Sequence, residues 1–575
     1  MISIYQFIRV NKTTKSEIDK DNFRNQIQMN RRNALKLGVS ALAGLYLSPL
    51  LGQSHILNSP AFKGPFEPTW DSLEKYQVPD WFRDAKFGMW AHWGPQCEPE
   101  AGDWYGRGMY EEGSRQYKYH VEKYGHPSKF GFKDVINVWK ADKWNPEELV
   151  NLYKDSGAKY FMAMANHHDN LDLYDSKYQP QWNSTKVGPK KDIIAGWEKA
   201  ARKAGLPFAV SVHAAHAWNW FDTSQGADKN GPLAGVPYDG KLTKADGKGT
   251  WWEGLDPQDL YAQNHSLSVK TSDRASVHSQ WDWADGASVP SSAYCEKFHD
   301  RTIDLIEKYN PDMIYFDDTA LPLWPVSDAG LRIAAHMYNK SLQKNKTVQA
   351  VITGKILTEQ QRKTMVWDIE KGQSNDIEPL PWQTDTCIGN WHYDRGVYNN
   401  KRYKSAKTVI HTLVDVVSKN GNLMLNIPVR GDGSIDELER EIVKEIGVWM
   451  KLNSKSIYGT RPWKIFGEGP QQASAGALTA QGFNEGKGKP YTAEDIRFAQ
   501  KDKKLYATVM AWPENGVAVI KSLAKSNPNH TEKIRQIKLV STGEKLKFKQ
   551  TEEALEVYFP NQKPEASYAN VLEII

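Results

Sequence analysis

Two adjacent carboxylates, Asp317 and Asp318, follow a short apolar segment that runs from Pro311 to Phe316. An apolar run of this length, opened by an Asn-Pro turn, is typical of a buried strand. An amphipathic helix is predicted just before it, near 293–309, so the strand is expected to lie in a parallel α/β sheet with both faces covered. Such sheets place catalytic groups at the carboxyl ends of their strands, whereas an isolated aspartate more often caps the next helix.

Other polar side chains end further predicted strands of the chain. They are His92, His167, His168, Asp169, His213 and Glu370. Residues placed by chance would be scattered along the strands and over both ends, but these gather at one end, as in the active site of a barrel. Paired carboxyl groups can act as nucleophile and general acid, and histidines can orient a substrate or bind zinc.

A carbohydrate explains this set of side chains without a metal ion. The histidines do not form an HExxH motif, and the three cysteines, Cys97, Cys295 and Cys387, form no CxxC pair. The sequence also lacks a G-x-S-x-G elbow, a P-loop and a G-x-G-x-x-G turn after a strand. The 22 Trp and 26 Tyr residues offer aromatic faces of the kind that stack on sugar rings. We therefore predict a sugar-binding site with no metal and no cofactor.

Strands and helices alternate from about residue 82 to residue 452, which indicates an α/β fold with parallel pairing. The predicted strands are 86–92, 160–165, 208–212, 313–316, 348–352, 365–369 and 423–427. A (β/α)8-type barrel is the expected closure, and we assign residues 66–463 to this catalytic domain. The long Gly-, Asp- and Lys-rich stretch 218–290 is expected to form a functional loop at the rim of the barrel.

Beyond residue 463 the pattern changes to short alternating strands separated by turns. The predicted strands are 496–500, 504–512, 517–520, 534–540, 546–550 and 555–559. This texture predicts a smaller C-terminal β-sandwich over residues 464–575.

The N-terminal region carries the entire formal charge of the chain. Residues 1–52 contain eight basic and three acidic side chains, and the net charge of the whole sequence is +5. The remaining chain is therefore near neutral, which argues against a nucleic-acid partner. Arg31-Arg32 before a short apolar run resembles a twin-arginine export signal at 29–54, preceded by an extension at 1–28. We expect an exported protein, periplasmic or secreted, with no membrane span after processing.

Several motifs occur in an order that identifies a family. They are WFRDAKFG at 81–88, HWGP at 92–95, DWY at 103–105, HHD at 167–169, YFD at 315–317, LVDVVSKNGNL at 413–423 and IYGTRPW at 457–463. Over roughly residues 66–465 the chain resembles the α-L-fucosidases of glycoside hydrolase family 29. The resemblance implies a retaining exo-glycosidase that removes terminal α-L-fucose from fucosylated oligosaccharides or polysaccharides through a covalent glycosyl-aspartate.

The resemblance also implies roles for individual residues. Asp317 matches the family's nucleophile by its place in the aromatic-Asp motif. The positions that match the fucose pocket are His92, Trp104, His167, His168 and Tyr315. Asp103 stands where many members carry Glu, and His213 joins the predicted pocket because it ends the third strand.

The acid/base residue is predicted separately, because Gln383 occupies a position where several relatives carry Glu and an amide cannot serve as an acid. The carboxyl groups that follow or end the strand 365–369 are Asp368, Glu370, Asp376, Glu378 and Asp385. Glu370 is preferred because it lies furthest toward the catalytic end of that strand and has the longer side chain. The competing interpretation of Glu370 is an ion pair with Lys371.

Two other functions remain compatible with the sequence. The first is hydrolysis of a related sugar such as α-L-galactose, which shares the ring shape of fucose and adds a hydroxyl group. The second is a catalytically silent fucose-binding protein, against which the presence of Asp317 and the pocket histidines argues.

Overall fold

The computed structural model describes residues 64–269, 281–471, 484–486, 488–529 and 532–575. The extension predicted at 1–28 and the export signal predicted at 29–54 lie outside the described residues. Within those that are described, no helix combines the length and the apolar character required to cross a membrane.

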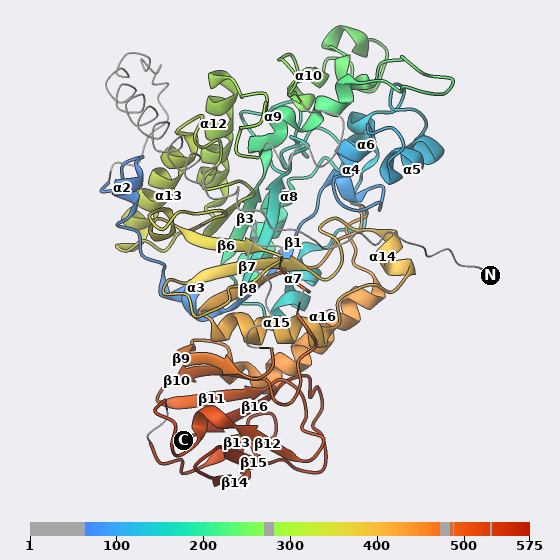
Figure 1. The fold of residues 1–575 in the computed structure, drawn as a ribbon. Helices are drawn as coiled ribbons and strands as arrows, with labels where there is room; N and C mark the ends of the chain where they lie inside the picture. The colour runs from blue at the N-terminus through green and yellow to red at the C-terminus, as the bar shows by residue number, and fades with distance from the viewer. Residues whose placement is uncertain (1–63, 270–280, 472–483, 487, 530–531) are drawn as a thin grey trace, which may run out of the picture. The chain divides into compact units, whose positions relative to one another are not determined.

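Eight parallel strands pair in chain order and close into a barrel (Figure 1). They are β1 (Phe87–Ala91), β2 (Tyr160–Asn166), β3 (Phe208–Val212), β4 (Met313–Phe316), β5 (Val351–Gly354), β6 (Val366–Glu370), β7 (Trp382–Cys387) and β8 (Gly421–Asn426). The predicted α/β barrel is thus confirmed, and seven of its strands overlap the predicted ones.

The strand that the sequence pattern did not reveal is β7, whose six residues are all buried although four of them are polar. Gln383 accepts a hydrogen bond from the Tyr160 hydroxyl at 3.0 Å, and Asp385 accepts one from the Tyr315 hydroxyl at 2.8 Å. Because these polar groups find partners in the barrel interior, the strand needs no apolar run.

Helices cover the barrel, and their starts follow local sequence signals. The helices of six residues or more are α3 (Asp80–Ala85), α5 (Arg115–Tyr124), α6 (Phe132–Val138), α7 (Pro146–Asp155), α8 (Ile193–Lys203), α12 (Ser292–Tyr309), α13 (Ala329–Asn345), α15 (Ala406–Ser418) and α16 (Glu437–Asn453). Shorter ones are α2 (Trp70–Leu73), α4 (Tyr105–Gly108), α9 (Ala217–Trp220), α10 (Pro257–Tyr261) and α14 (Arg395–Asn399). At α7, Asn145 caps the helix by accepting a hydrogen bond from the backbone N–H of Glu148, as its sequence indicates.

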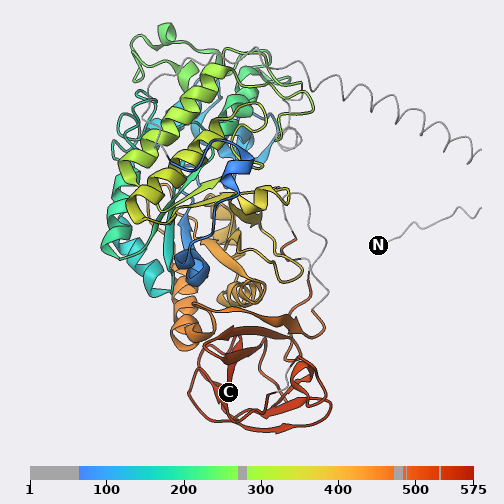
Figure 2. The ribbon, with the colours of Figure 1, turned by 90° about the vertical axis from the view of Figure 1, so that its left-hand side faces the viewer.

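The cover of the barrel is uneven around its circumference. The long helices α12 and α13, which flank β4 in sequence, pack side by side (Figures 1 and 2). In contrast, the connections 355–365 and 371–381, which are described throughout, contain no α-helix. The strands β5 and β6 are therefore followed by loops instead of the usual helices.

The described part of the long stretch after β3 packs against the rest of the barrel domain. The buried carboxylate of Asp239 accepts hydrogen bonds from the hydroxyls of Tyr110 and Tyr261, both at 2.6 Å, and contacts Lys133 Nζ at 3.0 Å. These contacts fix the stretch to the segment between β1 and β2.

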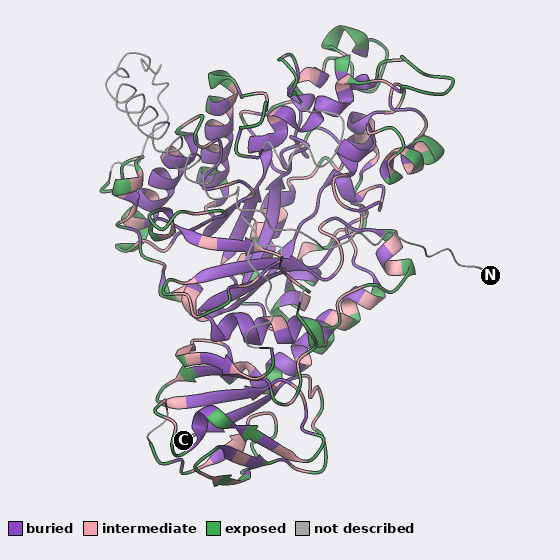
Figure 3. Cartoon of the chain, in the orientation of Figure 1, coloured by how far each residue is buried: buried purple, intermediate pink, exposed green. Residues whose placement is uncertain are grey.

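The C-terminal part folds into two antiparallel sheets that enclose a second hydrophobic core, which confirms the predicted sandwich. One sheet has the order β13-β16-β11-β10-β9 and the other β12-β15-β14. Their bounds are β9 (Arg461–Glu468), β10 (Ile496–Lys501), β11 (Lys504–Val509), β12 (Val517–Ile520), β13 (Ile537–Leu539), β14 (Lys547–Gln550), β15 (Leu555–Tyr558) and β16 (Asn570–Ile574). Figure 3 shows buried residues along the strands of both parts and exposed ones on the outer helices and turns.

A buried ion cluster joins the barrel to the sandwich. Asp415 of α15 contacts Lys419 Nζ at 2.6 Å and Arg497 Nε of β10 at 2.5 Å, and the three side chains are at most 3% exposed. Burial alone would raise the pKa of Asp415, but the two cations lower it to about 2. The cluster therefore holds a full negative charge in the interface.

We expect Arg497→Met to destabilise the protein by about 3–5 kcal/mol, because it leaves a buried carboxylate with only one of its two cations. Urea unfolding followed by tryptophan fluorescence measures this change. The control is Lys563→Met, which removes an exposed pair with Glu514 and should cost less than about 1 kcal/mol. Equal effects of the two substitutions would contradict a structural role for the buried cluster.

Candidate active site

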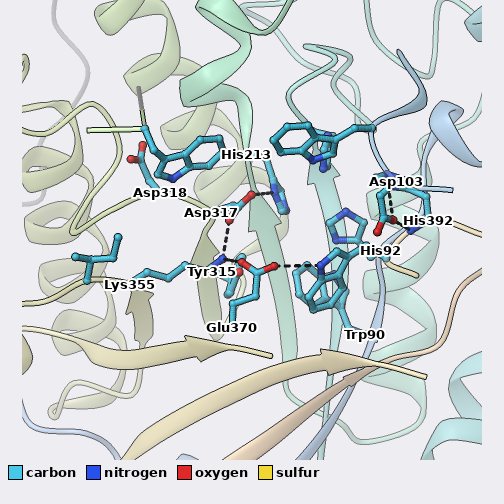
Figure 4. Close-up of a pocket in the computed structure, with 15 residues that line it drawn as sticks. Trp90, His92, Asp103, His213, Tyr315, Asp317, Asp318, Lys355, Glu370 and His392 are labelled. Atoms are coloured by element: carbon cyan, nitrogen blue, oxygen red, sulfur yellow. Dashed lines mark hydrogen bonds and ion pairs between the residues drawn. The ribbon is translucent and has the colours of Figure 1, made fainter. Parts of the chain in front are cut away.

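A cavity opens at the carboxyl ends of the barrel strands (Figure 4). It is lined by Trp90, His92, Asp103, Trp104, His167, His213, Trp281, Tyr315, Asp317, Asp318, Lys355, Ile356, Glu370, Trp391 and His392. Eight of the nine predicted site residues are in this set. The ninth, His168, is fully buried and lies behind the Asp317 carboxylate.

Asp317 follows β4 directly and is the most heavily contacted carboxylate of the cavity. Its Oδ1 atom lies 2.7 Å from Lys355 Nζ, and its Oδ2 atom lies 3.1 Å from His213 Nδ1 and 3.3 Å from His168 Nε2. Burial alone would raise the pKa of Asp317, but the Lys355 ammonium and the two histidines hold it well below its usual range. Asp317 is therefore an ionised carboxylate, as a nucleophile requires.

Asp318 has a different role. Its carboxylate accepts hydrogen bonds from His216 Nε2 at 3.2 Å, from the backbone N–H of Thr319 at 2.7 Å and from that of Leu323 at 3.3 Å. It therefore holds the loop after β4 in shape, whereas Asp317 contacts Lys355 and the histidines of the cavity.

Partners of the histidines determine which ring nitrogen faces the cavity. Gln96 Nε2 donates to His167 Nδ1 at 2.8 Å, so His167 keeps its proton on Nε2. The ionised Asp317 carboxylate can only accept, so His213 donates to it through Nδ1 and its Nε2 atom accepts from the Ser211 hydroxyl at 3.0 Å. Burial lowers the pKa of His213 to about 4, although Asp317 opposes this shift, and the ring is neutral.

Both ring nitrogens of His92 are buried and have no hydrogen-bond partner in the described part of the chain. Burial, followed by the neighbouring His392 and His213, lowers the pKa of His92 well below its usual value. A neutral imidazole with an unused donor and an unused acceptor matches the hydroxyl groups of a sugar. The Nδ1 atom of the neighbouring His392 lies 3.7 Å from Asp103 Oδ1.

The same histidines form groups that a metal ion could use. The ring nitrogens of His92, His167 and His392 lie within 4.8 Å of one another, and so do those of His167, His168 and His213. In the second group, His213 and His168 already contact the Asp317 carboxylate. A sugar hydroxyl and a cation would therefore compete for the same donor atoms.

Glu370 ends β6 and faces Asp317 across the cavity. Its Oε2 atom lies 2.5 Å from Lys355 Nζ, and its Oε1 atom accepts a hydrogen bond from Trp391 Nε1 at 3.2 Å. The lysine shared with Asp317 is thus Lys355, whereas Lys371 places its Nζ atom 5.0 Å from the centre of the Trp391 ring. The ion pair considered for Glu370 therefore exists with a different lysine.

The shared contact also limits the distance between the two carboxylates. Asp317 Oδ1 and Glu370 Oε2 each lie within 2.7 Å of Lys355 Nζ. The two oxygens are therefore closer than the roughly 6.5 Å at which the carboxyl pairs of inverting glycosidases begin.

The other candidate acids do not line the cavity. Asp385 and Asp368 are buried inside the barrel, where Asp385 accepts a hydrogen bond from Tyr315 and Asp368 accepts one from Gln383. Glu378 pairs with Arg362 at 3.2 Å. Tyr315 uses its hydroxyl on Asp385, so it presents its ring and not its hydroxyl to the cavity.

Comparisons with known proteins agree with this geometry. The sequence profile described as Alpha-L-fucosidase matches residues 55–455, and that of the Alpha-L-fucosidase C-terminal domain matches residues 489–575. The chain belongs to the α-L-fucosidases of glycoside hydrolase family 29. Its relatives include the tissue alpha-L-fucosidase of Rattus norvegicus, 25% identical over 80% of this chain and 81% of that protein. The alpha-L-fucosidase of Branchiostoma floridae is 24% identical over 83% of this chain and 88% of that protein.

Solved fucosidase structures share the fold of this family member. The alpha-fucosidase of Thermotoga maritima in complex with a mechanism-based inhibitor has a TM-score of 0.63 and 24% identity, over 89% of this chain and all of the other. A GH29 alpha-L-fucosidase from Bacteroides thetaiotaomicron, trapped as a covalent intermediate, has a TM-score of 0.55 and 15% identity, over 87% of this chain and 96% of the other. The protein is therefore a glycoside hydrolase, and it belongs to a family of enzymes that hydrolyse fucosides.

Sequence reasoning missed several residues of the fucosidase cavity. Lys355 was missed because the predicted fifth strand stopped at residue 352, whereas β5 continues to Gly354 and the lysine follows it directly. Trp391 and His392 follow β7, the strand that was not predicted. Their signal, a polar or aromatic side chain just past a strand, becomes visible only when the strand ends are known.

We expect Lys355→Met to raise the pKa of Asp317, because it removes the cation that contacts Oδ1. A reaction that uses the ionised carboxylate should then lose activity at a higher pH on the acid side of its profile. The pH dependence of kcat/KM for a nitrophenyl α-L-fucoside measures the shift. Lys371→Met, which removes a lysine that does not contact Asp317, should leave the acid side unchanged, and an unchanged profile in Lys355→Met would contradict the assignment.

Proposed function

We propose that the protein is a retaining exo-α-L-fucosidase in which Asp317 is the nucleophile and Glu370 is the general acid/base. The observation that carries this proposal is the arrangement of the two carboxylates around Lys355, at distances of 2.7 and 2.5 Å, in a cavity lined by histidines. Two carboxyl groups this close leave no room for a water molecule to attack directly, which favours a covalent intermediate.

In the first step, Asp317 attacks the anomeric carbon of the fucosyl group, and Glu370 gives its proton to the departing glycosidic oxygen. The C1–oxygen bond breaks as the bond between C1 and a carboxylate oxygen forms, so the aglycone leaves as an alcohol. His213 donates to the second oxygen of Asp317 and keeps the carboxylate oriented for attack.

In the second step, Glu370 takes a proton from water, which attacks C1 and releases Asp317. The glycosyl ester of Asp317 carries no charge, so Lys355 then has Glu370 as its remaining carboxylate contact in the cavity. Lys355 therefore stays in contact with the residue that acts as acid in the first step and as base in the second.

Recognition of the sugar is assigned to histidines and to aromatic side chains of the cavity wall. His92, His167 and His392 offer nitrogens to hydroxyl groups, and Asp103 adds an acceptor at the same side of the cavity. Trp104 and Trp281 supply aromatic surface. We assign fucosylated oligosaccharides or polysaccharides as substrates on this basis and on that of the family.

Location and domain limits are proposed from the sequence pattern. Residues 29–54 would direct export to the periplasm or the medium, and residues 66–463 and 464–575 would form the catalytic and C-terminal domains. Immunoblotting of cell fractions, with Arg31→Lys and Arg32→Lys as a double variant that should stay in the cytoplasm, tests the export signal.

Asp317→Gly should nearly abolish hydrolysis of a nitrophenyl α-L-fucoside, and sodium azide should partly restore it, because the anion fits the space left by the carboxylate. The product of rescue should be a fucosyl azide of inverted configuration, which NMR identifies. The matched variant is Asp318→Ala, which should lose stability and retain turnover without azide dependence. If Asp318→Ala were inactive and rescued by azide while Asp317→Gly stayed active, the nucleophile would be Asp318 and the assignment of Asp317 would be wrong.

Glu370→Ala should reduce kcat/KM for a fucosyl-oligosaccharide by about 10²–10⁴-fold, because the sugar alcohol needs protonation to leave. A dinitrophenyl fucoside needs little protonation, so its first step should be spared and the fucosyl-enzyme should accumulate, as mass spectrometry of the quenched protein would show. Glu378→Ala, a carboxylate outside the cavity, is the control. Normal rates of Glu370→Ala on the oligosaccharide would exclude Glu370 as the acid.

A further inference from the structure

A short piece of the C-terminal part, in the connection between β9 and β10, touches the turn that follows Glu370. Asn484 and Glu485 lie between β9 and β10, more than 100 positions from Glu370 in the sequence. They fall outside both family profiles, which match residues 55–455 and 489–575. Their contacts with the barrel are therefore a feature of this chain that the family pattern does not specify.

Both residues form hydrogen bonds with the backbone of the turn, at Lys371 and at Gln373. The backbone N–H of Glu485 donates to the carbonyl oxygen of Lys371 at 2.9 Å. The side chain of Asn484 accepts from the N–H of Gln373 at 2.9 Å and donates to the carbonyl oxygen of Gln373 at 3.0 Å. Asn484 is only 3% exposed, so this paired contact is shielded from water.

The turn itself requires such support. Lys371 adopts a left-handed backbone conformation with φ of 43°, which is unfavourable for a residue with a side chain. Its N–H donates to the carbonyl oxygen of Asp385 at 2.8 Å. Because no helix follows β6, the partners that fix this turn come from β7 and from the segment at 484–485.

The carboxylate of Glu485 anchors the segment to β7. It accepts hydrogen bonds from the Thr386 hydroxyl at 3.0 and 2.9 Å and contacts Lys404 Nζ at 2.6 Å. Lys404 also donates to the Thr386 hydroxyl at 2.7 Å. The segment is thus attached to both strands that flank the acid/base side of the cavity.

A shift of the turn after β6 would reach the Glu370 carboxylate through two routes. Glu370 immediately precedes Lys371, so a shift of the turn moves the backbone that carries the acid. In addition, Lys371 Nζ lies 5.0 Å from the centre of the Trp391 ring, whose Nε1 atom donates to Glu370. A displacement of the turn would therefore alter both the position of Glu370 and its hydrogen bond.

We propose that Asn484 and Glu485 are positioning residues for the general acid/base, so that the β9–β10 connection of the C-terminal domain supports efficient proton transfer. This inference rests on the proposed role of Glu370. Displacement of a reacting group by about 1 Å costs about 10²-fold in rate. The contact of Asn484 and Glu485 with the turn after β6 can therefore affect catalysis although it lies outside the cavity.

The test compares Asn484→Ala with wild type on a series of aryl fucosides whose leaving groups range from dinitrophenol to phenol, and on a fucosyl-oligosaccharide. The expected result is a loss of kcat that is at least about tenfold larger for phenol and the oligosaccharide than for dinitrophenol, with little change in KM. Glu485→Gln, which keeps an acceptor for Thr386, should lose less than Glu485→Ala. Asn527→Ala, a half-buried asparagine of the sandwich far from the turn in sequence, is the control and should behave like wild type.

An equal loss of activity on every leaving group, or no loss, would overturn the inference, because a structural defect alone does not discriminate among leaving groups. Glu370→Ala is measured on the same series to separate this result from the assignment of the acid. If Glu370→Ala shows the dependence and Asn484→Ala does not, the inference is wrong and the proposed function stands. If Glu370→Ala shows no dependence on the leaving group, Glu370 is not the acid, and Asn484 and Glu485 have no acid to position.

Discussion

The active site depends on one ammonium group that two carboxylates share. Lys355 Nζ lies 2.7 Å from Asp317 and 2.5 Å from Glu370, and its side chain is only 5% exposed. The shared cation offsets the repulsion between two carboxylates that lie this close. Each carboxylate also has its own neutral partner: His213 donates to Asp317, and Trp391 donates a hydrogen bond to Glu370. The placement of charges, more than shape alone, distinguishes the Asp317 side of the cavity from the Glu370 side.

Much of the barrel could be predicted from the sequence because buried parallel strands are apolar on both faces. That signal located β4 and the carboxylates after it, and ordered motifs then indicated the family. The signal failed at β7, because Gln383 and Asp385 are satisfied by tyrosine hydroxyls inside the barrel and leave no apolar run. It also failed at Lys355, since a lysine in a predicted loop is usually solvated. Both failures involve polar groups whose partners are distant in the chain, and only folding reveals those partners.

The contact between Asn484 and Gln373 belongs to the same class. Nothing in the composition of either segment indicates that an asparagine of the C-terminal region pairs with the backbone of a barrel loop. The ion cluster of Asp415 and Arg497 is similar, because a charged pair on α15 and β10 would ordinarily be interpreted as surface charge. Together these contacts make the sandwich part of the framework of the catalytic barrel, whereas its sequence alone indicates a separate accessory module.

The missing helices after β5 and β6 have an evolutionary consequence. The proposed nucleophile, Asp317, stands on a strand flanked in sequence by α12 and α13, where a substitution must preserve the packing of two long helices. The proposed acid/base, Glu370, stands on a strand followed by loops, which tolerate insertion and exchange far better than packed helices do. Divergence among descendants of this chain would therefore accumulate on the Glu370 side of the cavity, so that new glycan preferences can arise while the Asp317 side is inherited unchanged.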